Sequence, residues 1–394
     1  MKFFATCSKG TEGALRQELA ALKLPAVRGG RGGVHFEGKL EHGAKACLHS
    51  RTAMRVLLEL AAFPVSGADD LYEAAHAVDW TPWLTEKTTL AVEATGLAPG
   101  VTHTGFAALK VKDGVVDQLR EKLGARPDVD SRNPDVPIVL HLDGGQGTLS
   151  LDLAGEPLHK RGWRTTTSVA PLKETLAAAV LLLGRIDTGL PFVDPLCGSG
   201  TLAIEQALRA RCIAPGLDRS FAFQRWTCYR DELQSRWDKL RGQARAAVLP
   251  SLPAPIFASD FHPKAIDACR RNAHLAGVAG DLVIEQANVR DLQPRGEAGT
   301  LCMNPPYGER LIAEEDGPEA RSAARTQERK LVGFYRLLAE LLERHDGWSA
   351  VLLSGNPLLQ QALSRKAEID HRLWNGPLEI HLLRYRLARS RSNR

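Results

Sequence analysis

Apolar and polar residues alternate over short distances in the first half of the chain, which predicts small strands between amphipathic helices. Phe3–Thr6 is expected to form a strand, and Leu15, Leu19 and Leu22 form one apolar stripe of a helix over 11–22. A glycine-rich turn at 29–33 precedes an alternating strand, and this β-α-β-β order predicts a small α+β module. Further elements are expected as helices over 40–50, 71–77 and 106–123 and strands over 56–60, 89–94, 136–142 and 148–153.

From residue 171 onwards, the pattern changes to strands that alternate with longer helices. That alternation predicts a parallel sheet with helices on both faces, and therefore a Rossmann-like α/β domain. The stretch 207–252 is too long for a simple crossover and is expected to contribute extra helices. The expected strands are 192–194, 256–259, 282–286, 300–303, 350–353 and 378–386, and the helices are 172–183, one from 202, 263–276 and 330–344.

The charge of the chain is unevenly distributed. The net charge is +5 overall, and it separates into +6 for residues 1–55, −8 for residues 56–160 and +7 for residues 161–394. Basic surfaces at both ends are suited to phosphate contacts, so an RNA partner is consistent with the distribution. The arginines near the C-terminus could equally form a solvated basic tail.

Cysteine usage and hydropathy indicate where the protein works. The seven cysteines are scattered and none forms a Cys-x-x-Cys pair, which favours free thiols in a reducing compartment. The longest apolar run, Leu176–Leu183, is too short to span a bilayer, and the N-terminus lacks a signal-peptide pattern. We therefore expect a cytoplasmic protein, away from membranes and without a metal site, that is a monomer or a weak homo-oligomer.

A glycine-rich segment, residues 194–201, joins an expected strand to an expected helix. Glycines at this position allow a ligand to approach the backbone closely at the carboxyl end of a sheet strand. Gly198-x-Gly200-x-x-Ala203 also fits a nicotinamide dinucleotide fingerprint. Cys197 is expected to be a small wall residue, because no His or Asp partner for a nucleophile is evident.

Two further polar segments follow the next strands. Asp260 could accept hydrogen bonds from both hydroxyls of a nucleoside ribose while Phe261 packs on the adenine. Alternatively, Asp260 could cap the helix that begins at Pro263. Asn288 or Asp291, after the third strand, could accept a hydrogen bond from an adenine amine.

The segment Asn304-Pro305-Pro306-Tyr307-Gly308 carries the strongest chemical signal. It follows the expected strand 300–303, so it should face the same cleft as the glycine segment. The Asn304 amide oxygen and a proline-region carbonyl can accept both hydrogens of an exocyclic amine, which directs the nitrogen lone pair at an electrophilic methyl while Tyr307 stacks on the base. A base must be flipped or single-stranded to reach such a pocket.

These motifs resemble those of a known family. Residues 194–201 resemble the S-adenosyl-L-methionine-binding loop of class I methyltransferases, and residues 304–307 resemble their amino-methylating motif. Leu158–Arg164 and Ala170–Thr175 resemble a subgroup with an N-terminal THUMP RNA-binding domain, to which Ser50–Ala53 and Phe106–Asp113 are also similar. The resemblance covers nearly the whole chain and is greatest to the ribosomal RNA large-subunit methyltransferase L family, although Trp163 stands where a tyrosine is expected.

The resemblance implies a fold, a reaction and a set of domains. The fold class would be α/β, with a C-terminal Rossmann-like class I methyltransferase domain after an α+β ferredoxin-like/THUMP module. The reaction would be methylation of guanine N2 in 23S rRNA, although related THUMP enzymes act on tRNA. Some members carry a second methyltransferase domain, which is not expected here. The implied domains are 1–45 (start of the ferredoxin-like module), 45–155 (THUMP), 156–170 (linker) and 171–394 (methyltransferase).

Other functions remain open at this point. A DNA adenine or protein-glutamine methyltransferase would also use an Asn-Pro-Pro-Tyr pocket, whereas a nicotinamide-dependent oxidoreductase or a non-catalytic RNA-binding protein would not. The expected RNA contacts also have alternatives, since the lysines could lie on a solvated helix face and the arginines could join the domains.

The expected site residues fall into three groups. The catalytic group is Asn304, Pro305, Pro306 and Tyr307. The cofactor group is Thr175, Asp194, Pro195, Cys197, Gly198, Ser199, Gly200, Thr201, Ser259, Asp260, Phe261, Asn288, Val289, Asp291 and Asn304. The RNA group is Lys110, Lys112, Arg161, Trp163 and Arg164.

Overall fold

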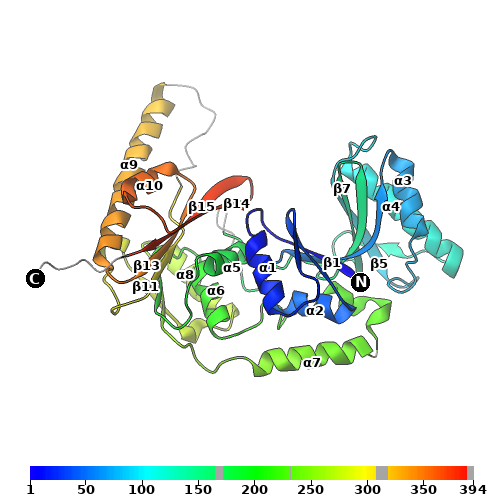
Figure 1. Ribbon diagram of the computed structural model, residues 1–394, viewed down its shortest axis with the longest axis horizontal. Coiled ribbons are helices and arrows are strands. Elements are labelled where there is room, and N and C mark those ends of the chain that lie inside the picture. The colour runs from blue at the N-terminus through cyan, green and yellow to red at the C-terminus, as the bar shows by residue number, and fades with distance from the viewer. Residues whose placement is uncertain (165–171, 231, 308–317, 388–394) are drawn as a thin grey trace, which may run out of the picture. The chain divides into compact units, whose positions relative to one another are not determined.

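The computed structural model describes residues 1–164, 172–230, 232–307 and 318–387 (Figure 1). None of the helices in these ranges is long and apolar enough to cross a membrane. The chain divides into two compact units, and each is built from segments that are separated in sequence. Unit 1 contains Met1–Cys7, Glu12–Arg161 and Ala214–Ala247, and unit 2 contains Ser8–Thr11, Gly162–Ile213 and Val248–Arg394.

Unit 1 is built on an eight-stranded sheet with the order β2-β3-β1-β4-β8-β7-β5-β6. The helices and strands expected for this half are confirmed within a few residues, whereas the short strands β2 and β6 were not expected. Helices α3 and α4 pack together beside the strands of its second half (Figure 1). The elements are β1 (Lys2–Thr6), α1 (Glu12–Ala21), β2 (Arg28–Gly30), β3 (Gly33–Glu37), α2 (Leu40–His49), β4 (Arg55–Pro64), α3 (Ala68–Ala77), β5 (Thr89–Gly96), α4 (Thr104–Leu123), β6 (Asp128–Val129), β7 (Val136–Asp143) and β8 (Gln146–Asp152).

Strand β4 makes one sheet out of what the sequence suggested were two modules. It pairs antiparallel with β1 along one edge and with β8 along the other, and the register with β8 shifts between Glu59 and Ala61. Such a bulge bends a strand and increases its twist, which allows one strand to serve both halves. At its start, Arg55 forms an ion pair with the buried carboxylate of Asp152.

The insertion after the first strand of the catalytic half packs with unit 1. It contains η1 (Ala222–Arg225), η2 (Thr227–Tyr229) and α7 (Glu232–Ala246), so the extra helices expected here are confirmed. Trp237 packs edge-on against Phe221 and Phe223, with ring centroids 5.7 and 5.2 Å apart. Trp226 of the insertion packs edge-on against Trp83, with ring centroids 5.4 Å apart, and this contact joins the insertion to the rest of unit 1. The sequence pattern did not predict this placement.

Unit 2 is built on a seven-stranded sheet with the order β11-β10-β9-β12-β13-β15-β14. Strands β9 to β13 are mutually parallel, as expected, but β15 is antiparallel to β13 and to β14. The expectation of a parallel sheet is therefore wrong at this edge. The reason is local: only Gly376 and Pro377 connect β14 to β15, and a two-residue connection permits only antiparallel pairing.

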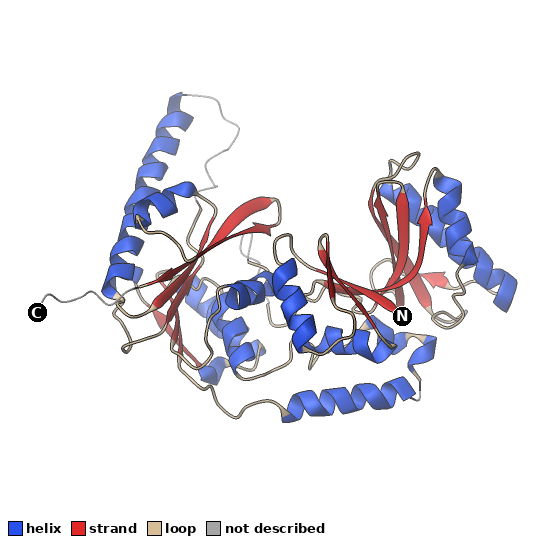
Figure 2. Cartoon of the chain, viewed as in Figure 1, coloured by secondary structure: helices blue, strands red, loops and turns tan. Residues whose placement is uncertain are grey.

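Successive residues of the central strands point to opposite faces of the sheet, where they belong to two separate hydrophobic cores. Phe192, Cys302 and Val351 pack against α5, α6 and α8 on one face, while Val193, Met303 and Leu352 pack against α9 and α10 on the other. Figure 2 shows helices on both faces of this sheet. Helix α9 begins twelve residues earlier than its expected start at Lys330. The elements are α5 (Glu174–Leu183), β9 (Phe192–Asp194), α6 (Thr201–Ala210), β10 (Ile256–Asp260), α8 (Pro263–Leu275), η3 (Ala279–Asp281), β11 (Leu282–Gln286), η4 (Val289–Asp291), β12 (Thr300–Met303), α9 (Pro318–Arg344), β13 (Ser349–Ser354), α10 (Pro357–Leu363), β14 (Ile369–Asn375) and β15 (Leu378–Arg386).

Candidate active site

The glycine loop connects β9 to α6 at the carboxyl end of the parallel strands. Gly200 has a φ of +87°, and a Cβ added there would lie 2.5 Å from the Cys269 sulfur. Gly198 also has a positive φ, of +52°, but an added Cβ would enter open space. The Cys197 N–H donates to the Ser259 carbonyl at 2.9 Å, which ties the loop to β10. The loop is therefore packed on one side and open on the other, as a ligand cradle requires.

Asp260 at the end of β10 holds the glycine loop from the neighbouring strand. One carboxylate oxygen accepts the Gly198 N–H at 3.0 Å and the other accepts the His262 N–H at 2.9 Å. The N-cap residue of α8 is His262, so the alternative reading of Asp260 as that cap is wrong. The carboxylate instead fixes the backbone at the most open point of the loop.

Asp194 is a buried carboxylate at the end of β9, with 1% of its surface exposed. Burial raises the pKa of Asp194 to about 8, the Leu196 N–H partly opposes this, and the nearby charge of Asp260 adds to it. Two carboxylates that converge at the ends of adjacent strands make a site that favours a positively charged ligand.

Replacing Asp194 should change the pH dependence of stability. Because the pKa in the folded state lies above the ordinary value of 3.8, the folded protein binds this proton more tightly than the unfolded chain does. Its contribution to stability is therefore complete below about pH 4 and is lost as pH rises towards about 8. An amide cannot ionise, so Asp194→Asn removes the loss of stability that the buried carboxyl causes as pH rises. We therefore expect this variant to stabilise the unliganded protein at pH 8 by on the order of 2 kcal/mol, and by much less at pH 5.

Thermal unfolding at the two pH values tests this expectation. The exposed Asp187 provides a matched control, since Asp187→Asn should leave the melting temperature nearly unchanged at both. A stabilisation by Asp194→Asn of equal size at pH 5 and pH 8 would contradict the assigned titration.

A cavity of about 340 Å³ lies beyond the ends of β10 and β11. Ser259 and Asp291, which were predicted to bind the cofactor, line this cavity, and their cofactor role stays a prediction. The Asn288 side chain accepts the Arg290 N–H at 3.0 Å. Val289 is buried in the core behind the turn, and the Phe261 side chain is 62% exposed. The cavity is completed by Glu285, Ala287, Leu292, Gln293, Pro294 and Arg295, which the sequence did not single out.

Arg164 organises the glycine loop from outside. Its guanidinium forms an ion pair with Glu174 at 2.6 Å, and it donates to Thr201 Oγ1 at 2.9 Å and to Ser199 Oγ at 3.3 Å. The two ion-paired side chains are only 13% and 4% exposed. These contacts give Arg164 a role in positioning the glycine loop, and its predicted contact with RNA stays a prediction. Glu174 was missed, because an isolated Glu at a helix start gives no sequence signal.

The other residues expected at RNA also make contacts within the protein. Arg161 donates to the Leu158 and Arg51 carbonyls at 2.7 and 2.6 Å, and Trp163 is buried in the core of unit 2. On α4, Lys110 pairs with Asp69 at 3.7 Å and Lys112 with Asp113 at 2.7 Å. RNA binding by these side chains stays a prediction. The arginines beyond Leu387, together with Ala170, Pro171 and Gly308, lie outside the described residues.

The Asn-Pro-Pro-Tyr segment leaves β12 at the same edge of the sheet as the glycine loop, because β12 pairs in parallel with β9. The Tyr307 hydroxyl donates to the Asn304 amide oxygen, and the Pro306 carbonyl accepts the Tyr335 hydroxyl at 2.8 Å. Burial raises the pKa of Tyr335 to about 12, so it remains a donor. The backbone of the segment is thus fixed by a helix that lies far along the chain.

The loop after β13 supports Tyr307 from the other side. The Asn356 amide donates to the Tyr307 carbonyl at 3.3 Å, and a Cβ added to Gly355 would lie 2.8 Å from the tyrosine ring. Gly355 therefore allows the ring to lie against the backbone. Sequence reasoning missed Tyr335, Gly355 and Asn356, since none belongs to a recognisable motif.

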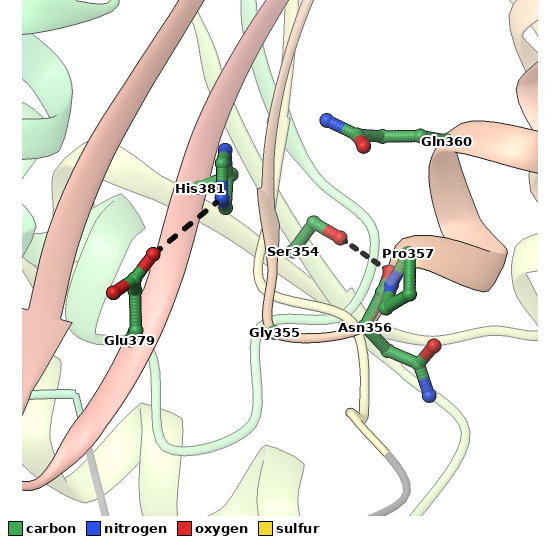
Figure 3. Close-up of a pocket in the computed structure, with 7 residues that line it drawn as sticks. All are labelled: Ser354, Gly355, Asn356, Pro357, Gln360, Glu379 and His381. Carbon is green, nitrogen blue, oxygen red and sulfur yellow. Dashed lines mark hydrogen bonds and ion pairs between the residues drawn. The ribbon is translucent and has the colours of Figure 1, made fainter.

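A second cavity, of about 180 Å³, opens beside this loop (Figure 3). The residues lining this second cavity are Ser354, Gly355, Asn356, Pro357, Gln360, Glu379 and His381. The first cavity lies at β10 and β11, on one side of β12 in the sheet, and the second lies at β13 and β15, on the other side. The Asn-Pro-Pro-Tyr segment, which follows β12, therefore lies between the two cavities.

Within the described residues, no group of His, Cys, Asp or Glu side chains could hold a metal ion. The seven cysteines are all free.

Fold and site together define a class I methyltransferase domain that follows ferredoxin-like and THUMP modules. The family model described as the RMKL-like methyltransferase domain matches residues 161–384, so the chain belongs to that family. The models of the RlmL ferredoxin-like domain and the THUMP domain match residues 2–57 and 65–152. The expected α/β class, with its ferredoxin-like and THUMP modules, is thereby confirmed.

Individual relatives agree with the family. The chain is 44% identical over 404 residues to the ribosomal RNA large subunit methyltransferase K/L of Syntrophotalea carbinolica, covering 99% of this chain and 54% of that protein. The chain thus spans about half the length of the curated relatives that it matches. The crystal structure of SMU.472, complexed with SAH, is 29% identical with a TM-score of 0.88 and 99% coverage of both chains. A Listeria monocytogenes structure, described as a predicted N6-adenine-specific DNA methylase, is 28% identical with a TM-score of 0.83, covering 98% of this chain and 95% of that one.

Proposed function

We propose that this chain transfers a methyl group from S-adenosyl-L-methionine to the exocyclic N2 of guanine in 23S rRNA. The observation that carries the proposal is the position of Asn304 at the same sheet edge as the acidic glycine loop, between the two cavities. The names of the K/L relatives favour large-subunit rRNA as the substrate. Methylation of guanine N2 in tRNA is the main alternative.

The residues around the glycine loop fit this cofactor. S-adenosyl-L-methionine would supply an electrophilic methyl on a cationic sulfonium, and Asp260 would provide compensating negative charge. Because the pKa of Asp194 is raised to about 8 in the unliganded protein, a bound cation would also favour the ionised form of Asp194. The Thr175 hydroxyl is buried and has no hydrogen-bond partner within the described part of the chain, so it is available to a polar ligand atom. The nucleoside would occupy the 340 Å³ cavity, where Ser259 and Asp291 supply polar contacts.

Asn304 would hold the acceptor amine. In the absence of substrate, the Tyr307 hydroxyl satisfies the Asn304 oxygen, and the incoming amine would replace it while the ring turns to stack on the base. The Pro306 carbonyl already accepts from Tyr335, so we assign the second amine hydrogen to the Pro305 carbonyl. In that position the amine nitrogen would accept the methyl group while the sulfur leaves as a neutral thioether, and solvent water would take up the proton that the methylated amine loses. Catalysis is therefore positioning plus electrostatics.

The first half of the chain would bind the RNA. We propose the ferredoxin-like module from residue 1, the THUMP domain over 45–155, the linker over 156–170 and the methyltransferase domain from 171, with the basic residues 1–55 contacting phosphate. Free thiols are typical of proteins in a reducing compartment, which supports the cytoplasm as the place of action.

The deciding experiment is transfer of labelled methyl to separate rRNA and tRNA pools that lack the modification, followed by nucleoside analysis. N2-methylguanosine in the large rRNA is the expected product. If N2-methylguanosine appears in tRNA alone, the substrate is tRNA and the proposed mechanism still holds. N6-methyladenosine would instead indicate an adenine acceptor. RNA binding without any methylated nucleoside would support a non-catalytic protein.

Asp260→Ala should weaken cofactor binding at least tenfold, because it removes both a ribose acceptor and the brace of the glycine loop. Calorimetric titration with S-adenosylhomocysteine measures this. Asp267, an exposed carboxylate on α8, provides the control Asp267→Ala, which removes the same charge without touching the loop. An unchanged dissociation constant for Asp260→Ala would contradict its role.

A further inference from the structure

The 180 Å³ cavity adjoins the ring that is expected to stack on the target base. Gly355 and Asn356 line the cavity, and both also contact Tyr307. The cavity lies on the far side of Asn304 from the cofactor cavity, which is where an acceptor molecule has to sit for in-line methyl transfer. It is therefore a candidate pocket for part of the flipped base.

Charged side chains enter this cavity from one strand. Glu379 and His381 are two residues apart on β15, so their side chains emerge from the same face, as Figure 3 shows. Their closest atoms, Glu379 Oε1 and His381 Nε2, are 4.0 Å apart. Gln360 and Asn356 line the cavity from the α10 side. The sequence analysis did not single out any of these residues.

Neighbouring residues hold this pair in place. The Nδ1 atom of His381 lies 2.5 Å from the Asp370 carboxylate, whose other oxygen accepts the Gln360 amide at 3.4 Å. The guanidinium of Arg372 lies 3.8 Å from Glu379 Oε1, so a cation faces this carboxylate from β14. Glu379 is 46% exposed and is thus a hydrogen-bond acceptor at the mouth of the cavity.

The edge of guanine beside N2 supplies the matching donor. In guanine one of the two ring nitrogens beside the amino-bearing carbon, N1, is protonated, whereas in 2-aminopurine both of these nitrogens are unprotonated acceptors, as is the N1 beside the amino-bearing carbon of adenine. A carboxylate accepts a hydrogen bond from the protonated N1 of guanine, whereas it is repelled by the lone pair of an unprotonated nitrogen. Resting on the function proposed above, we infer that Glu379 accepts the N1–H of the target guanine and determines the base specificity of methyl transfer. His381 and Arg372 are positioning residues for this carboxylate.

The test compares guanine with 2-aminopurine, which keeps the 2-amino group but lacks the N1–H and the 6-oxo group. An RNA that carries 2-aminopurine at the methylated position is assayed against the natural RNA. The unaltered protein should prefer guanine in kcat/KM by at least about tenfold, because the Glu379 carboxylate repels an accepting N1 and, once the base covers the cavity mouth, has no donor from it. Glu379→Gln should reduce that preference at least about tenfold, since the amide N–H can donate to an unprotonated N1.

A matched variant separates specificity from stability. Glu368→Gln alters an ion-paired carboxylate beside β14, outside the cavity, and should leave the preference unchanged. Both variants should keep the affinity for S-adenosylhomocysteine. A preference in Glu379→Gln equal to that of the unaltered protein would overturn the inference. Absence of N2-methylguanosine from the unaltered protein would instead overturn the proposed function, so the two failures are distinguishable.

Discussion

Asn304→Ala is expected to lower kcat for methyl transfer by about a hundredfold or more while leaving cofactor affinity within about twofold. The side chain supplies an acceptor oxygen that orients the amine, and its loss leaves the nitrogen lone pair without direction. The proposed cofactor contacts other than Asn304 itself lie at the ends of β9, β10 and β11, which the substitution does not touch. Single-turnover methyl transfer and calorimetry with S-adenosylhomocysteine measure the two quantities separately.

Two further variants make the result interpretable. Asn304→Asp keeps an accepting oxygen and should retain more activity than the alanine variant. Asn375→Ala, at the end of β14 and away from the Asn-Pro-Pro-Tyr segment, should behave as the unaltered protein. Undiminished turnover in Asn304→Ala, or a loss of cofactor affinity as large as the loss of turnover, would contradict the assigned role.

Arg164→Met is expected to destabilise the protein by about 3–5 kcal/mol, because it leaves the buried Glu174 carboxylate without its cation. The guanidinium also holds Ser199 and Thr201, so the glycine loop should become less ordered and cofactor affinity should fall. Urea unfolding of the unliganded protein measures the first effect, and calorimetry measures the second.

A double substitution tests the mechanism of this loss. In Arg164→Met combined with Glu174→Leu no charge remains unpaired, so a large part of the stability should return while the loop stays unsupported. Arg386→Met, which breaks an ion pair whose arginine is 75% exposed, should cost less than about 1 kcal/mol. Equal losses in the free energy of unfolding for Arg164→Met and Arg386→Met would contradict the prediction that breaking the buried ion pair costs more stability than breaking the exposed one.

The local sequence pattern was sufficient to predict most elements and the two loops of the site, residues 194–201 and 304–307. Hydrophobic periodicity located the strands of unit 2 that form its parallel part, and the polar segments 194–201 and 304–307 follow two of them directly. Parallel strands end at one edge of a sheet, so the sequence alone predicted that Asp194, Asp260 and Asn304 would share an edge. This prediction succeeded because strand direction follows from short-range alternation of strands and helices.

Tertiary structure alone decided which distant residues support that edge. Nothing in the local pattern indicates that Tyr335 fixes the Pro306 carbonyl, that Gly355 accommodates the Tyr307 ring or that Glu379 enters the adjoining cavity. The roles of Arg164 with Glu174, and the packing of the insertion into unit 1, likewise depend on contacts between separated segments. Periodicity reports which face of an element is buried, but the neighbour that buries it is chosen by long-range packing and by the pairing of charges away from water.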